Sequence, residues 1–184
     1  MEATQLVSRS DGSTQRFPRV GRLRYTLETT HQHWHLLRFD RYELRTVPGG
    51  KLVRPDRKTG FCLGDRYQTD PTLSLPGEPL AAVWTDECGR SQPLLPTVRE
   101  GISVGYGDDY DPLLEGQYVD VTGLRAGRYE LVHRVNADRA LRESDYRNNA
   151  ASIVLALSWP SGHRHEPGID VVARCGDGRR CRSR

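Results

Sequence analysis

Three of the chain's six histidines occupy alternate positions in the segment His31-Gln32-His33-Trp34-His35. Alternate side chains of a β-strand point to the same face of a sheet, so His31, His33 and His35 would stand in one row. Three neutral imidazoles that converge from one strand suit a late transition-metal ion with a position left open for water or substrate. An exposed, histidine-rich strand face is the alternative. Strict alternation followed by an apolar run favours metal binding.

The segment that would carry these histidines has the strongest strand pattern in the chain. Residues 33–47 fit a strand with one irregularity of register, and Pro48-Gly49-Gly50 predicts a turn that returns Lys51-Leu52-Val53 as a hairpin partner. Apolar alternation predicts further strands over residues 21–27, 117–121, 128–136 and 150–159. Residues 54–95 are predicted to be mostly loop, and the apolar residues show no long helical periodicity. We therefore predict an all-β fold, an antiparallel β-sandwich with long irregular loops.

Composition narrows the classes of partner. The chain has 184 residues and a net charge of +3, and its only lysines are Lys51 and Lys58. The arginines are dispersed among acidic residues without an aromatic-interleaved basic stripe, so we expect no nucleic-acid partner. No stretch approaches the roughly 20 apolar residues that span a bilayer, so we expect no membrane span. The first residues also lack the basic start and apolar core of a signal peptide.

Four cysteines allow three disulfide pairings. The simplest pairs Cys62 with Cys88 and Cys175 with Cys181. Disulfides would indicate an oxidising compartment. Neither pair has the spacing of a zinc ribbon, so a structural metal site made of the four cysteines is not expected.

Four sequence blocks follow one another in a defined order. The histidine block covers residues 31–44, and the second block is Arg57-Lys58-Thr59-Gly60-Phe61-Cys62-Leu63-Gly64-Asp65. The third covers residues 101–122, and the fourth covers residues 127–149 and ends in Tyr146-Arg147-Asn148-Asn149. In this combination the chain resembles the lysyl oxidase catalytic domain in its bacterial form. The resemblance spans roughly residues 21–158. It implies one catalytic domain over residues 1–174, followed by a Cys/Arg-rich tail over residues 175–184.

The resemblance implies two cofactors. Lysyl oxidases hold copper with the histidines of this block, here His31, His33 and His35. Their organic cofactor, lysine tyrosylquinone, forms from one lysine and one tyrosine of the same chain. The lysine precedes the Phe-Cys-Leu segment and corresponds to Lys58. The tyrosine lies seven residues before Gln117 and corresponds to Tyr110. Tyr106 has the wrong spacing for this role.

The implied activity is the copper- and quinone-dependent oxidative deamination of primary amines, lysyl side chains or small amines, to aldehydes. The quinone accepts electrons, dioxygen reoxidises it, and hydrogen peroxide and ammonia are released. A base must remove the α-proton of the amine, and burial would raise the pKa of a suitable carboxylate. Sequence leaves four candidates for that base: Asp65, Asp108, Asp109 and Asp111. The resemblance also implies a secreted protein, although this chain shows no signal peptide.

The chain departs from the family pattern in two ways. We expect it to begin inside the domain, with the first strands missing. Its cysteines are also fewer than in animal lysyl oxidases. A catalytically silent, metal-binding β-sandwich is therefore the alternative function, and an adhesion or matrix module is a weaker third. Three other histidines are expected to be structural: His133 in a strand, and His163 and His165 in a solvated turn.

Overall fold

A computed structural model describes residues 1–9, 11–29, 32–55, 60–72, 74–109, 111, 113, 117–176 and 180–181. The chain forms two compact units, Met1–Leu37 with Gly60–Gln117, and Arg38–Thr59 with Tyr118–Arg184. The strands of unit 1 are β1 (Glu2–Ser8), β2 (Thr14–Tyr25), β3 (Trp34–Leu37), β6 (Gly60–Phe61), β7 (Tyr67–Gln68) and β8 (Tyr106–Gly107). Those of unit 2 are β4 (Asp40–Thr46), β5 (Leu52–Pro55), β9 (Gly127–Val135), β10 (Ala150–Ser158) and β11 (Gly168–Cys175).

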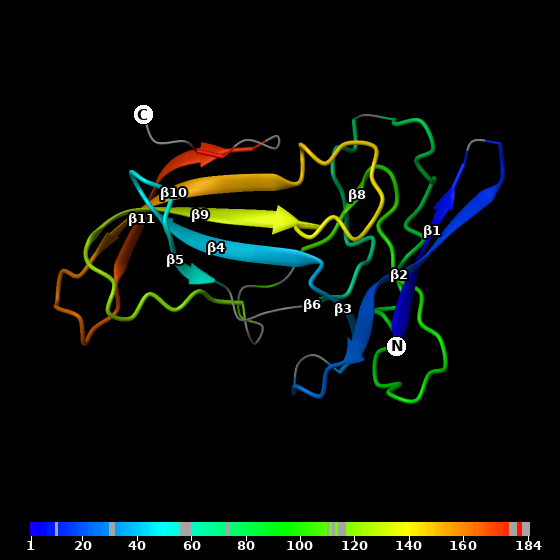
Figure 1. Cartoon of the computed structure of the whole chain (residues 1–184), viewed down its shortest axis with the longest axis horizontal. Helices are drawn as coiled ribbons and strands as arrows, with labels where there is room; N and C mark the ends of the chain where they lie inside the picture. The colour runs from blue at the N-terminus through cyan, green and yellow to red at the C-terminus, as the bar shows by residue number, and fades with distance from the viewer. Residues whose placement is uncertain are drawn as a thin grey trace. The chain divides into compact units, whose positions relative to one another are not determined.

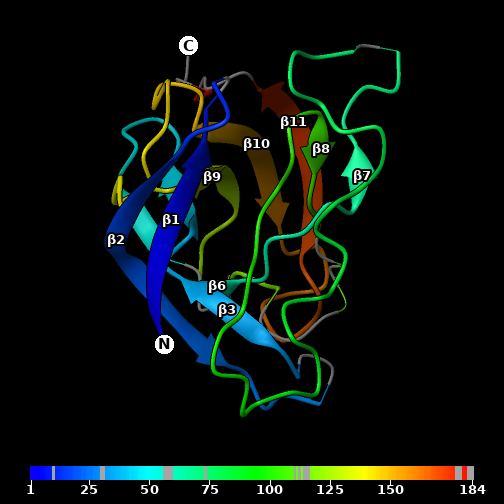
Figure 2. The same cartoon turned by 90° about the vertical axis from the view of Figure 1, so that its right-hand side faces the viewer.

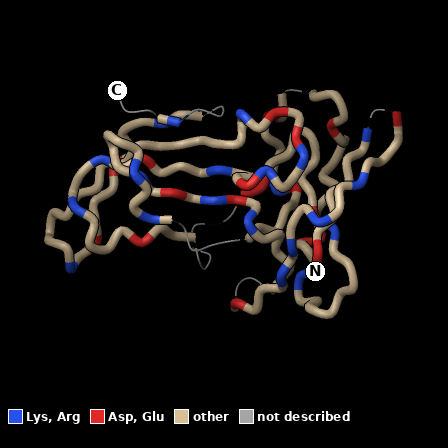
Figure 3. Tube along the Cα trace, viewed as in Figure 1, with Lys and Arg blue, Asp and Glu red and all other residues tan. Residues whose placement is uncertain are grey.

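All strand pairs in the described part of the chain are antiparallel. The predicted all-β antiparallel class is therefore confirmed. The sandwich arrangement and the domain boundary at residue 174 stay predictions. No helix among the described residues has the length and apolar character needed to cross a membrane. Basic and acidic residues are interspersed along the trace (Figure 3), as the dispersed arginines predict.

Unit 1 contains a four-stranded sheet in the order β1-β2-β3-β6, and the long β1–β2 hairpin is seen in Figure 2. The β1–β2 hairpin turns at Asp11-Gly12, with Gly12 at φ 82° and the Asp11 carboxylate accepting the Ser13 amide. The strand predicted over residues 21–27 begins earlier, at Thr14, and β1 lies outside every predicted strand. Both segments are largely exposed and lack apolar alternation, so only their pairing identifies them.

The single strand predicted over residues 33–47 is two strands in different sheets. It divides after Leu37, where Arg38 has a φ of 63°, a left-handed conformation that interrupts an extended strand. The predicted register irregularity marks this break. Beyond it, β4 and β5 form the predicted hairpin, with Glu43 opposite Pro55.

Unit 2 is built on a five-stranded sheet in the order β11-β10-β9-β4-β5, which is seen in Figure 1. The strands predicted over residues 128–136 and 150–159 are confirmed as β9 and β10. Leu44, Leu124 and Leu157 form the buried core of this unit and are 2%, 9% and 5% exposed. The strand predicted over residues 117–121 is wrong, because these residues are irregular. Their alternation instead supplies Val119 and Val121 to the same core.

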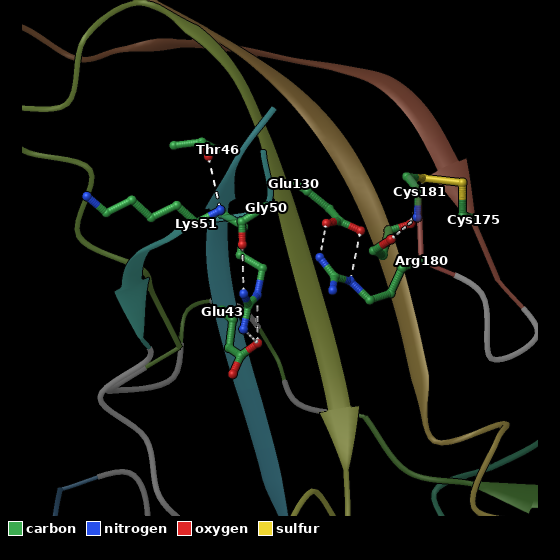
Figure 4. Close-up of polar contacts among 10 residues, drawn as sticks. Glu43, Thr46, Gly50, Lys51, Glu130, Cys175, Arg180 and Cys181 are labelled. Atoms are coloured by element: carbon green, nitrogen blue, oxygen red, sulfur yellow. Dashed lines mark hydrogen bonds and ion pairs between the residues drawn. A yellow bond between two sulfur atoms is a disulfide. The ribbon is translucent and has the colours of Figure 1, made fainter. Parts of the chain in front are cut away.

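The C-terminal segment is attached to the other face of this sheet (Figure 4). Two nitrogens of the Arg180 guanidinium bind the two oxygens of Glu130, which is 3% exposed. The amide of Cys181 donates to the Ser152 hydroxyl over 2.7 Å. The disulfides Cys62–Cys88 and Cys175–Cys181 are both formed, so the predicted pairing is confirmed. One disulfide lies in each unit.

The core of unit 2 gives the first prediction. Leu44→Ala should lower the free energy of unfolding by about 3 kcal/mol, because it leaves a cavity among buried leucines. The measurement is urea unfolding followed by circular dichroism. Leu52→Ala is the matched control, since Leu52 is 43% exposed on the edge strand β5 and should cost less than about 1 kcal/mol. Equal losses in the two variants would contradict this account of the core.

Candidate functional site

The two described histidines of the alternating segment have their rings together. His35 is in β3 opposite Arg24, and the carbonyl of His33, just before β3, accepts the amide of Thr26. The Nε2 atoms of His33 and His35 are 2.7 Å apart, and the ring centroids are separated by 4.7 Å. His35 is 6% exposed and His33 is half-buried. His31, the third predicted ligand, lies outside the described residues.

This arrangement suits either a shared proton or a shared metal ion. Two imidazole nitrogens 2.7 Å apart could share a proton or could both be ligands of one metal ion. The Nδ1 atom of His35 lies 3.2 Å from the Thr26 hydroxyl, which can fix the tautomer and leave Nε2 for a metal. Over the described residues no group of three or more His, Cys, Asp and Glu side chains gathers around one point. The described donors fit part of a site for copper or zinc.

A loop around Cys88 supports the histidine strand. The amide of Trp34 donates to the Cys88 carbonyl, and the Trp34 indole donates to Gln92. Trp34 is 9% exposed and meets Tyr25 edge-on at a ring-centroid distance of 5.6 Å, so it lies in the core of unit 1. Cys88 is bonded to Cys62, and each is 1% exposed. The disulfide thereby joins the loop to the segment that follows β6.

The Asp65 carboxylate joins three further segments. It accepts hydrogen bonds from the amides of Val83 and Trp84, at 2.8 and 3.2 Å, and from the amide and hydroxyl of Ser103, at 2.7 and 2.8 Å. Burial opposes ionisation of Asp65. These four hydrogen bonds outweigh that effect and hold the pKa of the carboxyl below its ordinary value. Asp65 is therefore a structural anion and a weaker base than an ordinary aspartate.

Asp108 is held differently. Its side chain is 1% exposed, and its Oδ2 accepts the Gly64 amide over 2.8 Å. Its Oδ1 lies 3.7 Å from Nε of Arg66 and accepts no hydrogen bond from a described residue. Burial raises the pKa of Asp108 to about 6, although the Gly64 amide and the Arg66 charge oppose the rise. Asp108 is thus a buried carboxylate whose basicity suits proton transfer near neutral pH.

Glu100 is a titratable residue that sequence reasoning missed. Burial raises its pKa to about 8, against the backbone amides of Leu63 and Leu36, and the charges of Asp86 and Asp108 add to the rise. Glu100 is therefore mostly neutral at pH 7. In the sequence it is one acid in an irregular stretch, and only the tertiary structure distinguishes it.

The remaining predicted residues have varied outcomes. Lys58 and Tyr110 lie outside the described residues. Asp109 is exposed, and the exposed Asp111 accepts the amide of Leu113 in a turn. Tyr106 is in β8.

The other histidines lie in unit 2. His133 is in β9 and stacks on Tyr42 at a centroid distance of 4.2 Å, as a packed strand residue. His163 is exposed and packs against Trp159, and His165 is exposed in the same turn.

The Lys58 and Tyr110 segments are connected through their described neighbours. Residues 60–65 directly follow the Lys58 segment, and residues 101–109 directly precede Tyr110. Hydrogen bonds join these two stretches from Ser103 to Asp65, from Gly64 to Asp108 and from Gly101 to Leu63. The pairing of β7 with β8 continues the contact. Two stretches far apart in sequence are thereby fixed side by side.

Comparison with known proteins identifies related chains. Residues 87–162 match the family Lysyl oxidase, a region that includes Tyr110 but not Lys58 or the alternating histidines. Lysyl oxidase homolog 3 of Homo sapiens is 30% identical over 135 residues, 72% of this chain and 16% of its own length. Lysyl oxidase homolog 2B of Danio rerio is 29% identical over 156 residues, 84% of this chain and 18% of its own. Protein-lysine 6-oxidase of Sus scrofa is 26% identical over 165 residues, 89% of this chain and 58% of its own.

The buried Asp65 gives the second prediction. Asp65→Asn should lower the free energy of unfolding by about 3 kcal/mol at pH 7, because charged hydrogen bonds are lost and an amide meets backbone donors. A depressed pKa stabilises the fold above the ordinary aspartate value of about 3.9, and this stabilisation is lost as the pH falls through the lower folded value. The difference in unfolding free energy between the wild type and Asp65→Asn should therefore shrink below about pH 4.

Denaturant unfolding from pH 3 to 8 measures this difference. Asp70→Asn is the control, because Asp70 accepts local hydrogen bonds from the amide and hydroxyl of Thr72. A loss at Asp65 no larger than that at Asp70 would refute the structural role of the Asp65 carboxylate.

Proposed function

Because this chain belongs to the lysyl oxidase family, we propose that it is a copper- and quinone-dependent primary-amine oxidase. It would convert lysyl side chains or small amines to aldehydes, with dioxygen as oxidant and hydrogen peroxide and ammonia as products. The chain spans less than a fifth of the length of the lysyl oxidase homologs 3 and 2B, and 58% of Protein-lysine 6-oxidase from Sus scrofa. The observation that most supports the proposal is the bonding of the stretch after Lys58 to the stretch before Tyr110.

His31, His33 and His35 would hold the copper. The fit rests on the two Nε2 atoms 2.7 Å apart and on the Thr26 hydroxyl at Nδ1 of His35. When bound, copper would supply the oxidation of the tyrosine ring with dioxygen, and the resulting quinone would supply an electron sink for the amine.

The chain's own residues would build and shield the organic cofactor. Lys58 would contribute its amine nitrogen and Tyr110 its ring. Asp65 and the Cys62–Cys88 disulfide would restrict the motion of the flanking stretches, so that the lysine and the tyrosine meet more often than on a free loop. Trp34 and Tyr25 would hold the histidine strand from its apolar side.

We also propose an oxidising, extracellular location. Two disulfides and no free cysteine are consistent with folding outside a reducing cytosol. The partners would be a primary-amine or lysyl-protein substrate and dioxygen.

A covalent bond between Lys58 and Tyr110 is the third prediction. Copper-loaded, aerated protein should yield a cross-linked Lys58–Tyr110 peptide by mass spectrometry and amine-dependent peroxide. Both should disappear in Lys58→Ala and Tyr110→Phe. Lys51→Ala and Tyr106→Phe are the matched controls and should keep both, since neither residue is in the proposed cofactor. Peroxide that persists without Lys58 and Tyr110 would eliminate the quinone.

Copper binding is the fourth prediction. The protein should bind about one copper per chain, and His33→Ala or His35→Ala should weaken binding by more than the roughly 10–100-fold typical of outer-shell changes. His163→Ala, with an exposed histidine removed from unit 2, is the control and should bind as the wild type does. Isothermal titration with copper measures this. Copper binding without any cross-link would instead favour a catalytically silent metal-binding domain.

A further inference from the structure

We infer that Asp108 is the base that takes the α-proton of the amine substrate, with Arg66 and Gly64 holding its carboxylate in place. The inference rests on the proposed function, and it selects one of the four aspartates that sequence leaves open. In this step the C–H bond at the α-carbon breaks and an O–H bond forms at Oδ1 of Asp108. The electron pair of the C–H bond passes to the quinone, which is reduced by two electrons while the amine carbon is oxidised. Dioxygen later accepts the two electrons.

The geometry of Asp108 distinguishes its two oxygens. Oδ2 is occupied by the Gly64 amide, whereas the buried Oδ1 accepts no hydrogen bond within the described part of the chain. Buried polar atoms are nearly always paired, because an unpaired one costs about 1–3 kcal/mol. An open oxygen on a side chain that is 1% exposed is therefore a feature that folding alone does not favour. It is the oxygen that remains available to a proton.

Position along the chain limits how far Asp108 can lie from Tyr110. Asp108 lies two residues before Tyr110. Two chain steps span at most about 7 Å between Cα atoms. The Gly64 hydrogen bond also attaches Asp108 to the stretch that follows Lys58. Asp108 is thus linked to both residues from which the cofactor would form.

The surroundings of Asp108 leave its carboxylate mostly ionised at pH 7 and make it a stronger base than an exposed aspartate. Burial raises the pKa of Asp108 to about 6, so the carboxylate is mostly charged at pH 7 and a stronger base than an exposed aspartate. The charged groups that act on it are Arg66 and Asp109, with opposite signs. Glu100 is also close, but it is mostly neutral at this pH because its pKa is about 8. The Arg66 charge and the Gly64 amide therefore oppose the rise of the Asp108 pKa.

The other three aspartates are less suitable. Both oxygens of Asp65 accept hydrogen bonds, four in total, and its pKa is lowered, so it is a poor proton acceptor. Asp109 is exposed, and Asp111 is exposed and accepts a turn amide. Neither has the buried environment that raises basicity.

The first test separates cofactor formation from proton transfer, and is the fifth prediction. Asp108→Asn has nearly the same shape and can still accept the Gly64 amide. It should retain the Lys58–Tyr110 cross-link and labelling by a carbonyl reagent such as phenylhydrazine. Anaerobic reduction of the cofactor by benzylamine should fall by about 10²–10⁴-fold. Asp111→Asn is the control, because Asp111 is exposed and its carboxylate accepts the Leu113 amide, and the cofactor in this variant should be reduced at the wild-type rate. Reduction at the wild-type rate in a labelled Asp108→Asn protein overturns the assignment while leaving the amine oxidase proposal intact.

The second test remains decisive if Asp108→Asn fails to fold or to form the cofactor. Carboxyl ¹³C NMR of the metal-free protein should show Asp108 titrating near pH 6. Arg66→Gln removes the opposing positive charge, so both this NMR pKa and the acidic limb of kcat/KM should move upward together. A kcat/KM limb that stays in place while the NMR pKa moves overturns the role of Asp108. A wild-type protein without any carbonyl-reactive cofactor overturns the proposed function and this inference with it.

Discussion

The Asp65 carboxylate accepts hydrogen bonds from residues 83, 84 and 103, and it is 6% exposed. The described part of unit 1 has little regular structure outside its four-stranded sheet, since β7 and β8 contain two residues each. Such a chain cannot satisfy its backbone through ladders, so a buried anion with several acceptor sites organises it instead. The contacts of Gly64 with Asp108 and of β7 with β8 follow from the same alignment of the two stretches.

The two units are stabilised by different physical effects. Unit 2 has a continuous sheet, and the burial of leucines and valines dominates there, with Leu44 and Leu157 on one face and Val132 and Val154 on the other. Unit 1 combines a small cluster around Trp34 and the Cys62–Cys88 disulfide with buried polar bonds. Unit 1 is also closely packed at particular positions, since a Cβ added at Gly101 would lie 2.7 Å from the Trp84 ring. His33, His35, Asp65 and Asp108 therefore all lie in the unit whose shape depends on specific polar contacts.

Sequence predicted the elements that alternate because they are half-buried. β9, β10 and the β4–β5 hairpin were found on that basis, and the disulfide pairing followed from proximity in the chain. Alternation reports burial and not strand pairing, so residues 117–121 were misread: Val119 and Val121 are packed, but no ladder forms. Strands β1 and β11 were missed for the opposite reason. They pair in sheets, but most of their residues stay exposed or half-buried.

The sequence predicted the arrangement of the site only where the residues are close together in the chain. Two residues of separation suffice to bring the rings of His33 and His35 together. Asp65 and Asp108 are the same residue type in similar Gly-rich surroundings, yet their pKa values move in opposite directions. Both are buried, and the difference comes from partners 18 to 44 positions away in the chain: Val83 and Ser103 for one, Gly64 for the other. The hydrogen bonds to Asp65 fix the loops around it. The same fixed loops can then bury the Asp108 carboxylate, one oxygen of which accepts no hydrogen bond from a described residue. The structural role of Asp65 and the basicity of Asp108 thus both follow from the alignment of the same two stretches of chain.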